Sequence, residues 1–383
     1  MRIIHYCQHI WGVGHFFRSI EVCRALKNHD VIMVTGGPEF NAVLPDHVRL
    51  FRLPGLMTDR NYDGLFPTDN NKTFQQVKQA RQELLYGLIE REAPDILIIE
   101  LYPFGRKAFR FELDPVLKGI RNGHLNPCKV VCSLRDILVE KKDPVAYETR
   151  VVDILNRYFH ALLIHADSNL VKLDHTFSRI ADLNMPVVYT GFVSQKPPPD
   201  AREKIRRRLD LGDNEALIIA SAGGGKAGIV LLQPLLESMS LLNLDRKCHL
   251  YAFTGPFMPD EEFELLKKFT NTQIQIERFS SNFLSYLAAA DLSVSMGGYN
   301  TSMNLLATGV PAIIWPYPGD REQGLRAESL AGIGAATVLK EKDLQPHRMV
   351  KIIDHSLCHS GKGSYQVDLQ GAENTAGWIQ RQG

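Results

Sequence analysis

Short apolar runs alternate along the chain with longer mixed segments that we expect to be helices. Runs of this kind, apolar on both faces, are typical of strands buried in a parallel sheet. The alternation therefore predicts an α/β fold with Rossmann-like sheets. The predicted strands are Arg2–Cys7, Asp30–Thr35, Val48–Leu53, Asp95–Glu100, Cys128–Leu134, Ala161–His165, Val187–Thr190, Leu217–Ser221, Cys248–Thr254, Gln273–Glu277, Asp291–Met296 and Pro311–Trp315.

The strongest change in composition divides the chain into two domains. The segment Gly191–Asp200 carries three prolines directly after Lys196, which is typical of a semi-rigid linker. A chain of 383 residues suits two domains, each able to bury its own core. We expect an N-terminal domain over residues 1–193, a linker over 194–200, a C-terminal domain over 201–372, and a final helix within 373–383 that packs back on the N-terminal domain.

Charge and composition exclude several classes of protein. The net charge of +1 predicts no preference for nucleic acid. No apolar run approaches the length of a membrane span, about 20 residues, and the chain enters its first strand without the apolar core of a signal peptide. The six cysteines show neither a CxxC pair nor zinc spacing, so we expect reduced thiols, a cytoplasmic protein and no metal site.

A glycine turn in the C-terminal half is the first candidate site. Gly297 and Gly298 follow a predicted strand, and we expect Asn300 or Thr301 to cap the next helix. The free amides at such a helix start, together with the positive end of the helix dipole, form a site for a diphosphate. The alternative is a plain strand-to-helix turn that binds nothing.

A polar loop after the last predicted strand carries Asp320, Glu322 and Gln323. Open α/β sheets bind ligands at the carboxyl ends of their strands. Neighbouring carboxylate and amide groups suit the reading of sugar hydroxyls, which both donate and accept hydrogen bonds. An ordinary charged first turn of a helix is the alternative.

Two further glycine-rich loops resemble nucleotide motifs only in part. Gly223, Gly224 and Gly225 end a strand, but Lys226 lacks the following Ser or Thr of a P-loop, so a nucleoside triphosphatase is disfavoured. The Trp-Gly-Val-Gly-His segment has Phe17 in place of the third glycine of a dinucleotide fingerprint, and the second strand does not end in an acid. A dehydrogenase is therefore disfavoured as well.

The combined pattern resembles a known family of enzymes. Ser-Met-Gly-Gly-Tyr-Asn-Thr, followed by Gly-Val-Pro and Asp-Arg-Glu-Gln, resembles the C-terminal donor site of inverting GT-B glycosyltransferases. The resemblance is to family 28, which includes the lipid II-forming transferase of peptidoglycan synthesis, and above all to a bacterial group of predicted glycosyltransferases. It implies two Rossmann-like domains facing across a cleft, with the acceptor bound by the N-terminal domain and a nucleotide sugar by the C-terminal domain. It is specific from about Gly223 to Leu339 and diffuse over residues 1–190.

The resemblance also implies roles for residues of the C-terminal domain. Asn304 stands where the family usually carries a glutamate for the ribose, which weakens but retains the expected contact. Phe279 would lie beside the nucleotide base, although a place in the core is equally compatible. The implied set is Gly223, Gly224, Gly225, Lys226, Gly297, Gly298, Asn300 and Thr301 for the diphosphate, Phe279, Ser280 and Asn304 for the nucleoside, and Asp320, Glu322 and Gln323 for the sugar.

In the N-terminal domain, the Gly-x-Gly-His loop resembles the entry of the acceptor domain. His15 would begin a helix whose dipole lowers the pKa of the imidazole and keeps it neutral, as a general base requires; a capping or packing role is the alternative. Two other stretches resemble the same group and end in Arg106 and in Arg135 with Asp136. Both arginines are candidates for an anionic acceptor or phosphate, and Asp136 competes with His15 as the base. A structural pairing of Arg135 with Asp136 is the alternative.

Two absences refine the expected reaction. The chain contains no Asp-x-Asp, and Met296 and Asn304 occupy the acidic positions of retaining GT-B enzymes. We therefore expect a metal-independent, cofactor-free and inverting transfer of a sugar from a nucleoside-diphosphate sugar, with UDP favoured, to an acceptor hydroxyl. The acceptor stays open between a lipid-linked molecule, which would bring the protein to the inner membrane face, and a small glycoside. The alternatives are a sugar-nucleotide hydrolase or epimerase of the same fold and a non-catalytic nucleotide-sugar-binding subunit.

Overall fold

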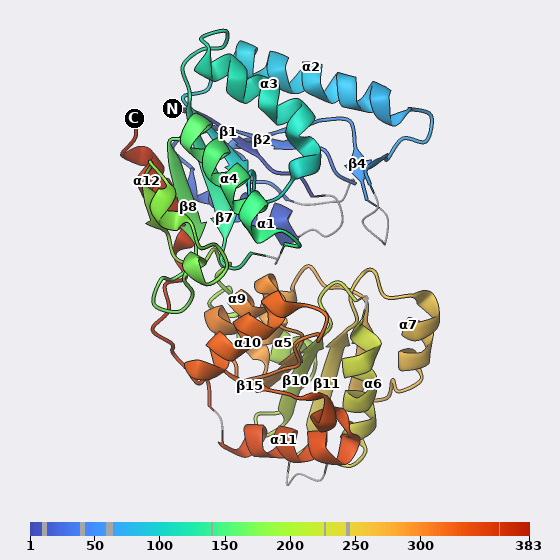
Figure 1. Cartoon of the computed structure of the whole chain (residues 1–383). Coiled ribbons are helices and arrows are strands. Elements are labelled where there is room, and N and C mark those ends of the chain that lie inside the picture. The colour runs from blue at the N-terminus through green and yellow to red at the C-terminus, as the bar shows by residue number, and fades with distance from the viewer. Residues whose placement is uncertain are drawn as a thin grey trace. The chain divides into compact units, whose positions relative to one another are not determined.

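The structure is a computed structural model that describes residues 1–9, 14–38, 43–58, 64–138, 141–225, 227–242, 246–359 and 361–383. The chain forms two compact units (Figure 1). Unit 1 comprises Met1–Val193 and Asp368–Gly383, and unit 2 comprises Ser194–Val367. None of the helices in the described ranges is long and apolar enough to cross a membrane.

Unit 1 is built on a parallel seven-stranded sheet in the order β3-β2-β1-β6-β7-β8-β9. The order reverses between β1 and β6, which are hydrogen-bonded neighbours. Such a switch point leaves a crevice at the carboxyl ends of the two strands, where ligands of α/β proteins bind. The strands are β1 (Arg2–Tyr6), β2 (Asp30–Thr35), β3 (Val48–Arg52), β6 (Ile96–Glu100), β7 (Lys129–Arg135), β8 (Ala161–His165) and β9 (Val187–Tyr189), and a separate antiparallel pair is formed by β4 (Leu56–Met57) and β5 (Phe66–Pro67).

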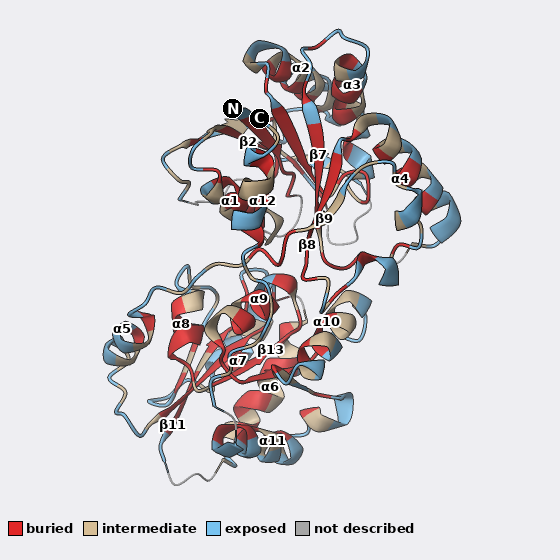
Figure 2. Cartoon of the chain, turned by 90° about the vertical axis from the view of Figure 1, so that its left-hand side faces the viewer, coloured by how far each residue is buried: buried red, intermediate tan, exposed pale blue. Residues whose placement is uncertain are grey.

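Helices cover the sheet of unit 1 and bury its apolar strands (Figure 2). The long helix α2 begins with a capping box in which Thr73 and Gln76 exchange side-chain-to-backbone hydrogen bonds. It lies beside α3, and the C-terminal α12 lies beside α1. The helices are α1 (Gly14–Ala25), α2 (Phe74–Glu92), α3 (Arg110–Arg121), α4 (Pro144–Tyr158) and α12 (Gly371–Gln380), with short 3₁₀ turns η1 (Lys107–Phe109), η2 (Leu173–His175) and η3 (Ile180–Asp182).

Unit 2 repeats the same plan with a parallel six-stranded sheet in the order β12-β11-β10-β13-β14-β15. Here the order reverses between β10 and β13, whose last residues Ser221 and Ser295 are register partners. The strands are β10 (Ala216–Ser221), β11 (Cys248–Phe253), β12 (Ile274–Glu277), β13 (Leu292–Ser295), β14 (Ala312–Ile314) and β15 (Ala336–Val338).

The helices of unit 2 enclose a core made mainly of aliphatic side chains from β10, β11, β13 and α6. Both faces of the sheet are covered, so the strands contain almost no exposed residues (Figure 2). The helices are α5 (Ala201–Arg208), α6 (Gly228–Met239), α7 (Asp260–Lys267), α8 (Phe283–Ala289), α9 (Tyr299–Thr308), α10 (Arg321–Gly332) and α11 (Pro346–His359), and η4 (Glu341–Leu344) is a 3₁₀ turn.

The end of the chain returns to unit 1 at Asp368, whereas the sequence predicts this return at residue 373. The Phe192 amide donates to the Asp368 carbonyl at 2.7 Å, and the Gly371 amide donates to the Phe192 carbonyl at 3.0 Å. These two bonds hold the segment before α12 against Phe192, close to the point where the chain first leaves unit 1. The predicted linker 194–200 is counted with unit 2. Backbone pairing between segments this far apart in sequence leaves no signal in the amino-acid composition, so this boundary could not be predicted.

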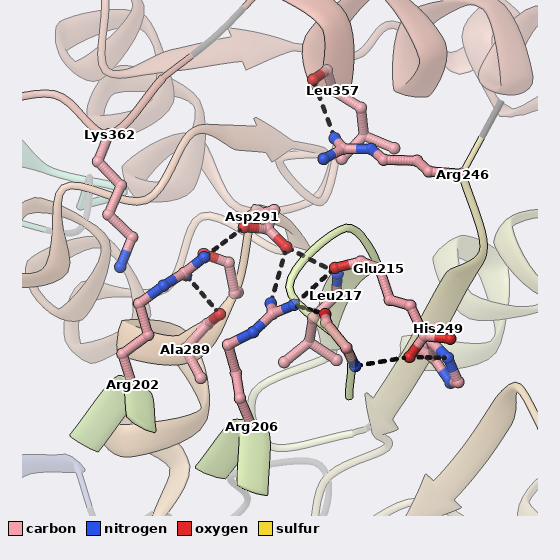
Figure 3. Close-up of polar contacts among 12 residues, drawn as sticks. Arg202, Arg206, Glu215, Leu217, Arg246, His249, Ala289, Asp291, Leu357 and Lys362 are labelled. Carbon is pink, nitrogen blue, oxygen red and sulfur yellow. Dashed lines mark hydrogen bonds and ion pairs between the residues drawn. The ribbon is translucent and has the colours of Figure 1, made fainter. Parts of the chain in front are cut away.

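Asp291, directly before β13, is the centre of a polar network at the amino ends of the unit 2 strands (Figure 3). Its carboxylate accepts hydrogen bonds from Arg202 at 2.9 Å, from Arg206 at 3.2 Å and from the Leu217 amide at 2.9 Å. Burial alone would raise the pKa of Asp291, but the Leu217 amide and the Arg202 guanidinium outweigh it and hold that pKa below its ordinary value. The network fastens α5 to the sheet.

Replacing Asp291 by alanine is expected to lower the free energy of unfolding by about 2 kcal/mol at neutral pH, because three donors lose their acceptor. The stabilisation from the lowered pKa is complete above the unfolded value, about 3.9, and is lost as the pH falls through the lower folded value. Urea unfolding at neutral pH and near pH 2.5 should therefore show a difference between wild type and variant that shrinks in acid. Asp213→Ala, an exposed position in the same unit, is the control; equal losses for both variants would contradict this role.

Candidate functional site

The two glycine turns predicted to bind a diphosphate lie side by side at the switch point of unit 2. Gly223, Gly224 and Gly225 follow β10, and Gly297 and Gly298 follow β13, its hydrogen-bonded neighbour. Each turn leads into a helix, α6 and α9 respectively. Both therefore stand at the edge where the carboxyl ends of the strands meet.

Three of these five glycines are favoured by the fold itself. Gly223 and Gly225 have φ values of +61° and +99°, which favour glycine, and a Cβ on Gly225 would lie 2.6 Å from the Thr254 carbonyl oxygen. A Cβ on Gly297 would lie 3.0 Å from the Gln323 carbonyl oxygen. Positive φ at Gly223 and Gly225, and close backbone packing at Gly225 and Gly297, thus account for these three glycines without a ligand.

Gly224 and Gly298 are different, because neither conformation nor packing requires a glycine there. A Cβ on Gly298 would meet no atom of the described residues within 4 Å, and one on Gly224 would meet only Phe257 Cδ2, at 3.8 Å. Gly298 has φ −66° and ψ 150°, which any residue adopts. Each turn thus has a position without a side chain that faces open space. A ligand can approach the backbone closely at such a position.

The helices behind the two turns begin without a side-chain cap. Gly298 is the N-cap of α9 and Ala227 is the N-cap of α6. The predicted capping of α9 by Asn300 or Thr301 is wrong, because the helix already begins at Tyr299 and both residues lie in its first turn. The first amides of a helix have no partner within the helix, so these two ends can present donors to an anion. In α6 the Gly228 amide already donates to the Gly225 carbonyl, at 3.1 Å, so the following amides are the candidates there. Lys226 lies outside the described residues.

The predicted sugar-reading residues gather at the start of α10. Asp320 is its N-cap and accepts from the Gln323 amide at 3.3 Å and from Gln323 Nε2 at 3.1 Å. Gln323 Oε1 in turn accepts from the Tyr317 amide at 3.2 Å. Glu322 pairs with Arg326 one helical turn further on. The cluster is therefore held in place by its own hydrogen bonds.

The predicted nucleoside residues occupy two elements of unit 2. Phe279 and Ser280 follow β12, and Phe279 is 55% exposed, which rules out the alternative of a core position. The Gly255 amide bonds the Arg278 carbonyl and the Phe257 amide bonds the Gly224 carbonyl, so one short loop connects this segment to the first glycine turn. Asn304 lies on α9 and is half-buried.

In unit 1, His15 lies on the first turn of α1 and contacts Glu100 across the switch point. His15 Nδ1 is 2.7 Å from Glu100 Oε1, and Arg18 pairs with the same oxygen. Because a carboxylate only accepts, this contact requires the proton on Nδ1, although Arg18 also lies 3.1 Å from that nitrogen. The lone pair of the neutral ring is then on Nε2, the atom that a general base uses.

The pKa of His15 is lowered to about 4, and burial is the largest cause. The Glu100 charge opposes the shift and Arg106 reinforces it. The sequence predicts this shift from the helix dipole, whereas burial is its largest cause in the structure. His15 is thus neutral at physiological pH, while its side chain is still 22% exposed.

The remaining predicted residues of unit 1 lie at the carboxyl ends of neighbouring strands. Arg106 follows β6 with φ +57°, and its buried Nε has no hydrogen-bond partner among the described residues. Arg106 lies close enough to lower the pKa of both His15 and Glu100. Arg135 is the last residue of β7 and is half-buried, and Asp136, which follows it, is fully buried. His15 is therefore the more accessible of the two candidate bases.

Sequence reasoning missed three charged residues that organise these sites. Glu100 and Arg18 hold His15, and Arg326 holds Glu322. An acid at the end of an otherwise apolar strand is the one signal that could have identified Glu100. Among the described residues, no group of three or more His, Cys, Asp or Glu side chains could hold a metal ion.

A cavity of about 620 Å³ lies elsewhere in unit 2. Its lining includes Cys248 and Ile274, the first residues of β11 and β12, so it opens at the amino ends of the strands. It contains none of the predicted donor residues. The switch point, identified by topology, therefore remains the candidate site.

Known proteins resemble this chain in sequence and in fold. Residues 222–375 match the family model of the glycosyltransferase family 28 C-terminal domain. An uncharacterized glycosyltransferase of Methanopyrus kandleri is 22% identical over 244 residues, which cover 63% of this chain and 67% of that protein. A UDP-N-acetylglucosamine–N-acetylmuramyl-(pentapeptide) pyrophosphoryl-undecaprenol N-acetylglucosamine transferase of Gloeothece citriformis is 28% identical over 170 residues, or 44% of this chain and 45% of that protein. The match thus spans less than half of the latter enzyme.

Solved structures show the same fold over the whole chain. The MurG protein of Acinetobacter baumannii has a TM-score of 0.61 at 15% identity, with all of both chains covered. The glycosyltransferase of kitacinnamycin has a TM-score of 0.60 at 16% identity, and the match covers 100% of this chain and 98% of that one. The chain therefore has the GT-B fold, and its residues 222–375 match the C-terminal domain of glycosyltransferase family 28.

Proposed function

We propose that this protein transfers a sugar, with inversion, from a nucleoside-diphosphate sugar to an acceptor hydroxyl, with UDP as the favoured nucleotide. The observation that carries the proposal is the pair of glycine turns at the switch point of unit 2. Gly224 and Gly298 leave the backbone exposed to open space there, although the fold does not require glycine at either position. Both precede helices that begin without a side-chain cap. An anion with two phosphate groups suits such a site.

On the donor side, the helix amides would stabilise the diphosphate as it leaves. Charge develops on the β-phosphate oxygen when the anomeric bond breaks, and fixed donors in a sheltered site stabilise that charge without reorganisation. This contribution needs no bound cation, so we propose a metal-independent reaction. Glu322 and Gln323 would bond the sugar hydroxyls, with Asp320 holding Gln323 in place. Phe279, Ser280 and Asn304 would contact the nucleoside.

On the acceptor side, His15 would act as the general base. The acceptor oxygen attacks the anomeric carbon, its proton passes to His15 Nε2, and the bond from that carbon to the phosphate oxygen breaks to release the nucleoside diphosphate. Glu100 fixes the required tautomer through Nδ1 and stabilises the imidazolium that forms. The burial of Asp136 disfavours it as the base.

We propose the class of the acceptor from the name of a relative and from the surroundings of Arg106. The name of the Gloeothece citriformis enzyme includes a pyrophosphoryl-undecaprenol compound. Near His15, the Nε of Arg106 has no hydrogen-bond partner within the described ranges and suits an anionic group. We therefore place a lipid-linked phosphate acceptor ahead of a small glycoside. The protein would then work in the cytoplasm and reach the inner membrane face to meet this substrate.

The test is turnover of a panel of UDP-sugars and dTDP-sugars with polyprenyl-phosphate-linked and simple glycoside acceptors. Acceptor-dependent release of the nucleoside diphosphate, with an inverted anomeric configuration by proton NMR and full activity in EDTA, is the expected result. Release without an acceptor would identify a hydrolase instead, and conversion of one nucleotide sugar into another an epimerase. Binding without any turnover would identify a non-catalytic subunit.

A further inference from the structure

Arg326 joins the two parts of the candidate donor site that the sequence treats as separate. It lies on α10, one turn after Glu322, and is only 2% exposed. Its Nη2 donates to Glu322 Oε1 at 2.8 Å, and its Nη1 donates to the Gly297 carbonyl at 3.1 Å. One guanidinium thus contacts a predicted sugar-reading side chain and the backbone of the predicted diphosphate turn.

The surroundings of Arg326 fix its orientation. Tyr299 is the first residue of α9. The Cζ atom of Arg326 lies 5.4 Å from the centre of the Tyr299 ring, within the range of a cation–π contact. The Gly297 position also packs directly on the first turn of α10, since a Cβ there would lie 3.0 Å from the Gln323 carbonyl oxygen. The glycine turn, the start of α9 and the start of α10 therefore meet around one buried cation.

A buried arginine is a costly way to hold a core together. Desolvation of an ion pair often cancels its Coulombic gain, and an apolar side chain of similar volume is commonly as stable. A planar guanidinium can bridge two acceptors in a fixed geometry, which neither an apolar group nor the compact lysine ammonium can do. The position of Arg326 thus favours a geometric role over a purely stabilising one.

We propose that Arg326 is a positioning residue of the donor site, which aligns the Glu322 carboxylate with the Gly297–Gly298 turn so that one nucleotide sugar contacts both. This assignment rests on the proposed function. The contact with Arg326 through Oε1 sets the orientation of the Glu322 carboxylate. As an acceptor-only group, this carboxylate selects sugar hydroxyls that donate. Arg326 itself acts through Glu322 and the turn and contacts no substrate.

The test compares the affinities of UDP and UDP-N-acetylglucosamine by calorimetry for wild type, Arg326→Lys, Glu322→Gln and the double variant. Glu322→Gln should weaken only the sugar nucleotide. Arg326→Lys should weaken UDP a few-fold through the turn and the sugar nucleotide by about tenfold more, the equivalent of one charged hydrogen bond. In the Glu322→Gln background, that extra loss should disappear, a coupling that a general loss of stability would not produce.

Arg326→Gln serves as a second variant if the lysine variant does not fold, and melting curves identify that case. Wild-type protein that binds neither UDP nor UDP-N-acetylglucosamine would overturn the proposed use of a UDP-sugar, and this assignment with it. Wild-type protein that binds both probes, combined with unchanged affinities for the Arg326 variants, would overturn this assignment alone. In another outcome, Arg326→Lys weakens the binding of the sugar nucleotide more than that of UDP, to the same extent, when Glu322 is already glutamine. That result would overturn the assignment as well.

Discussion

Replacing His15 by alanine is expected to lower the rate of sugar transfer by about 10²- to 10⁴-fold, the usual contribution of a general base. The affinity for the nucleotide should stay unchanged, because His15 belongs to unit 1 and the donor residues to unit 2. Steady-state kinetics of the purified variant give kcat and the donor KM separately. His124→Ala, an exposed histidine of the same unit, is the matched control and should behave as wild type.

The pH dependence provides an independent check on the same residue. Because the pKa of His15 is lowered to about 4, kcat/KM should hold constant down to about pH 5 and fall only below that, whereas an ordinary histidine would lose activity near pH 6.5. The charge of Glu100 raises the pKa of His15, so Glu100→Gln should move the acid limb further down. It should also reduce the rate, since a glutamine amide no longer enforces the tautomer.

Asp136 is the competing base, and its variant decides between the two. If Asp136→Asn lost the rate while His15→Ala kept it, the assignment of the base would be wrong. The His15–Glu100 pair would then have a structural role. This outcome corresponds to the alternative drawn from the sequence, in which His15 is a packing histidine. Circular dichroism and melting of each variant show that a lost rate does not reflect a lost fold.

Replacing Gly298 by leucine is expected to weaken UDP binding by about 100-fold or more, which corresponds to two lost charge-assisted hydrogen bonds at about 1.5 kcal/mol each. The added side chain would fill the space in front of the first turn of α9, where nothing in the described chain lies within 4 Å. Because the backbone at Gly298 is unstrained, the stability should change by less than about 1 kcal/mol. Calorimetric titration with UDP and thermal unfolding measure the two quantities.

Two other glycines supply the controls for Gly298. Gly332→Leu changes an exposed glycine at the end of α10 that also has open space around it, and it should leave UDP binding intact. Gly225→Ala should instead destabilise the protein, since its φ of +99° and the Thr254 carbonyl at 2.6 Å leave no room for a Cβ. Unchanged UDP affinity in Gly298→Leu would remove the turn from the donor site.

The fold could be read from the sequence because its cause is local. Buried parallel strands need continuous apolar runs, and runs such as Leu217–Ser221 and Ala161–His165 coincide with strands to within a residue. The division into two domains follows from the change in composition at Gly191–Asp200, and the GT-B fold is implied by the resemblance of the donor-site motifs to that family. Boundaries set by long-range contacts could not be read, such as the return of the chain at Asp368 through its bond to Phe192.

The candidate site shows the same division. The glycine turns and the polar start of α10 are local motifs and were recognisable. The partners that orient them are distant in sequence: Glu100 is 85 residues from His15, and Gly297 is 29 residues from Arg326. Local propensity also predicted the wrong cap for α9. Asn300 and Thr301 are good capping residues, yet the N-cap is Gly298, two positions before Asn300.

The most direct test of the donor site is the melting temperature of the wild-type protein with UDP, dTDP, GDP, CDP, NAD and ATP in turn. A ligand that binds only the folded state stabilises it by about 2.7 kcal/mol at a concentration of 100 times its Kd. A selective rise with UDP or dTDP is the predicted result. No rise with any nucleoside diphosphate, or a rise with NAD alone, would contradict the assignment of a nucleotide-sugar site at the switch point of unit 2.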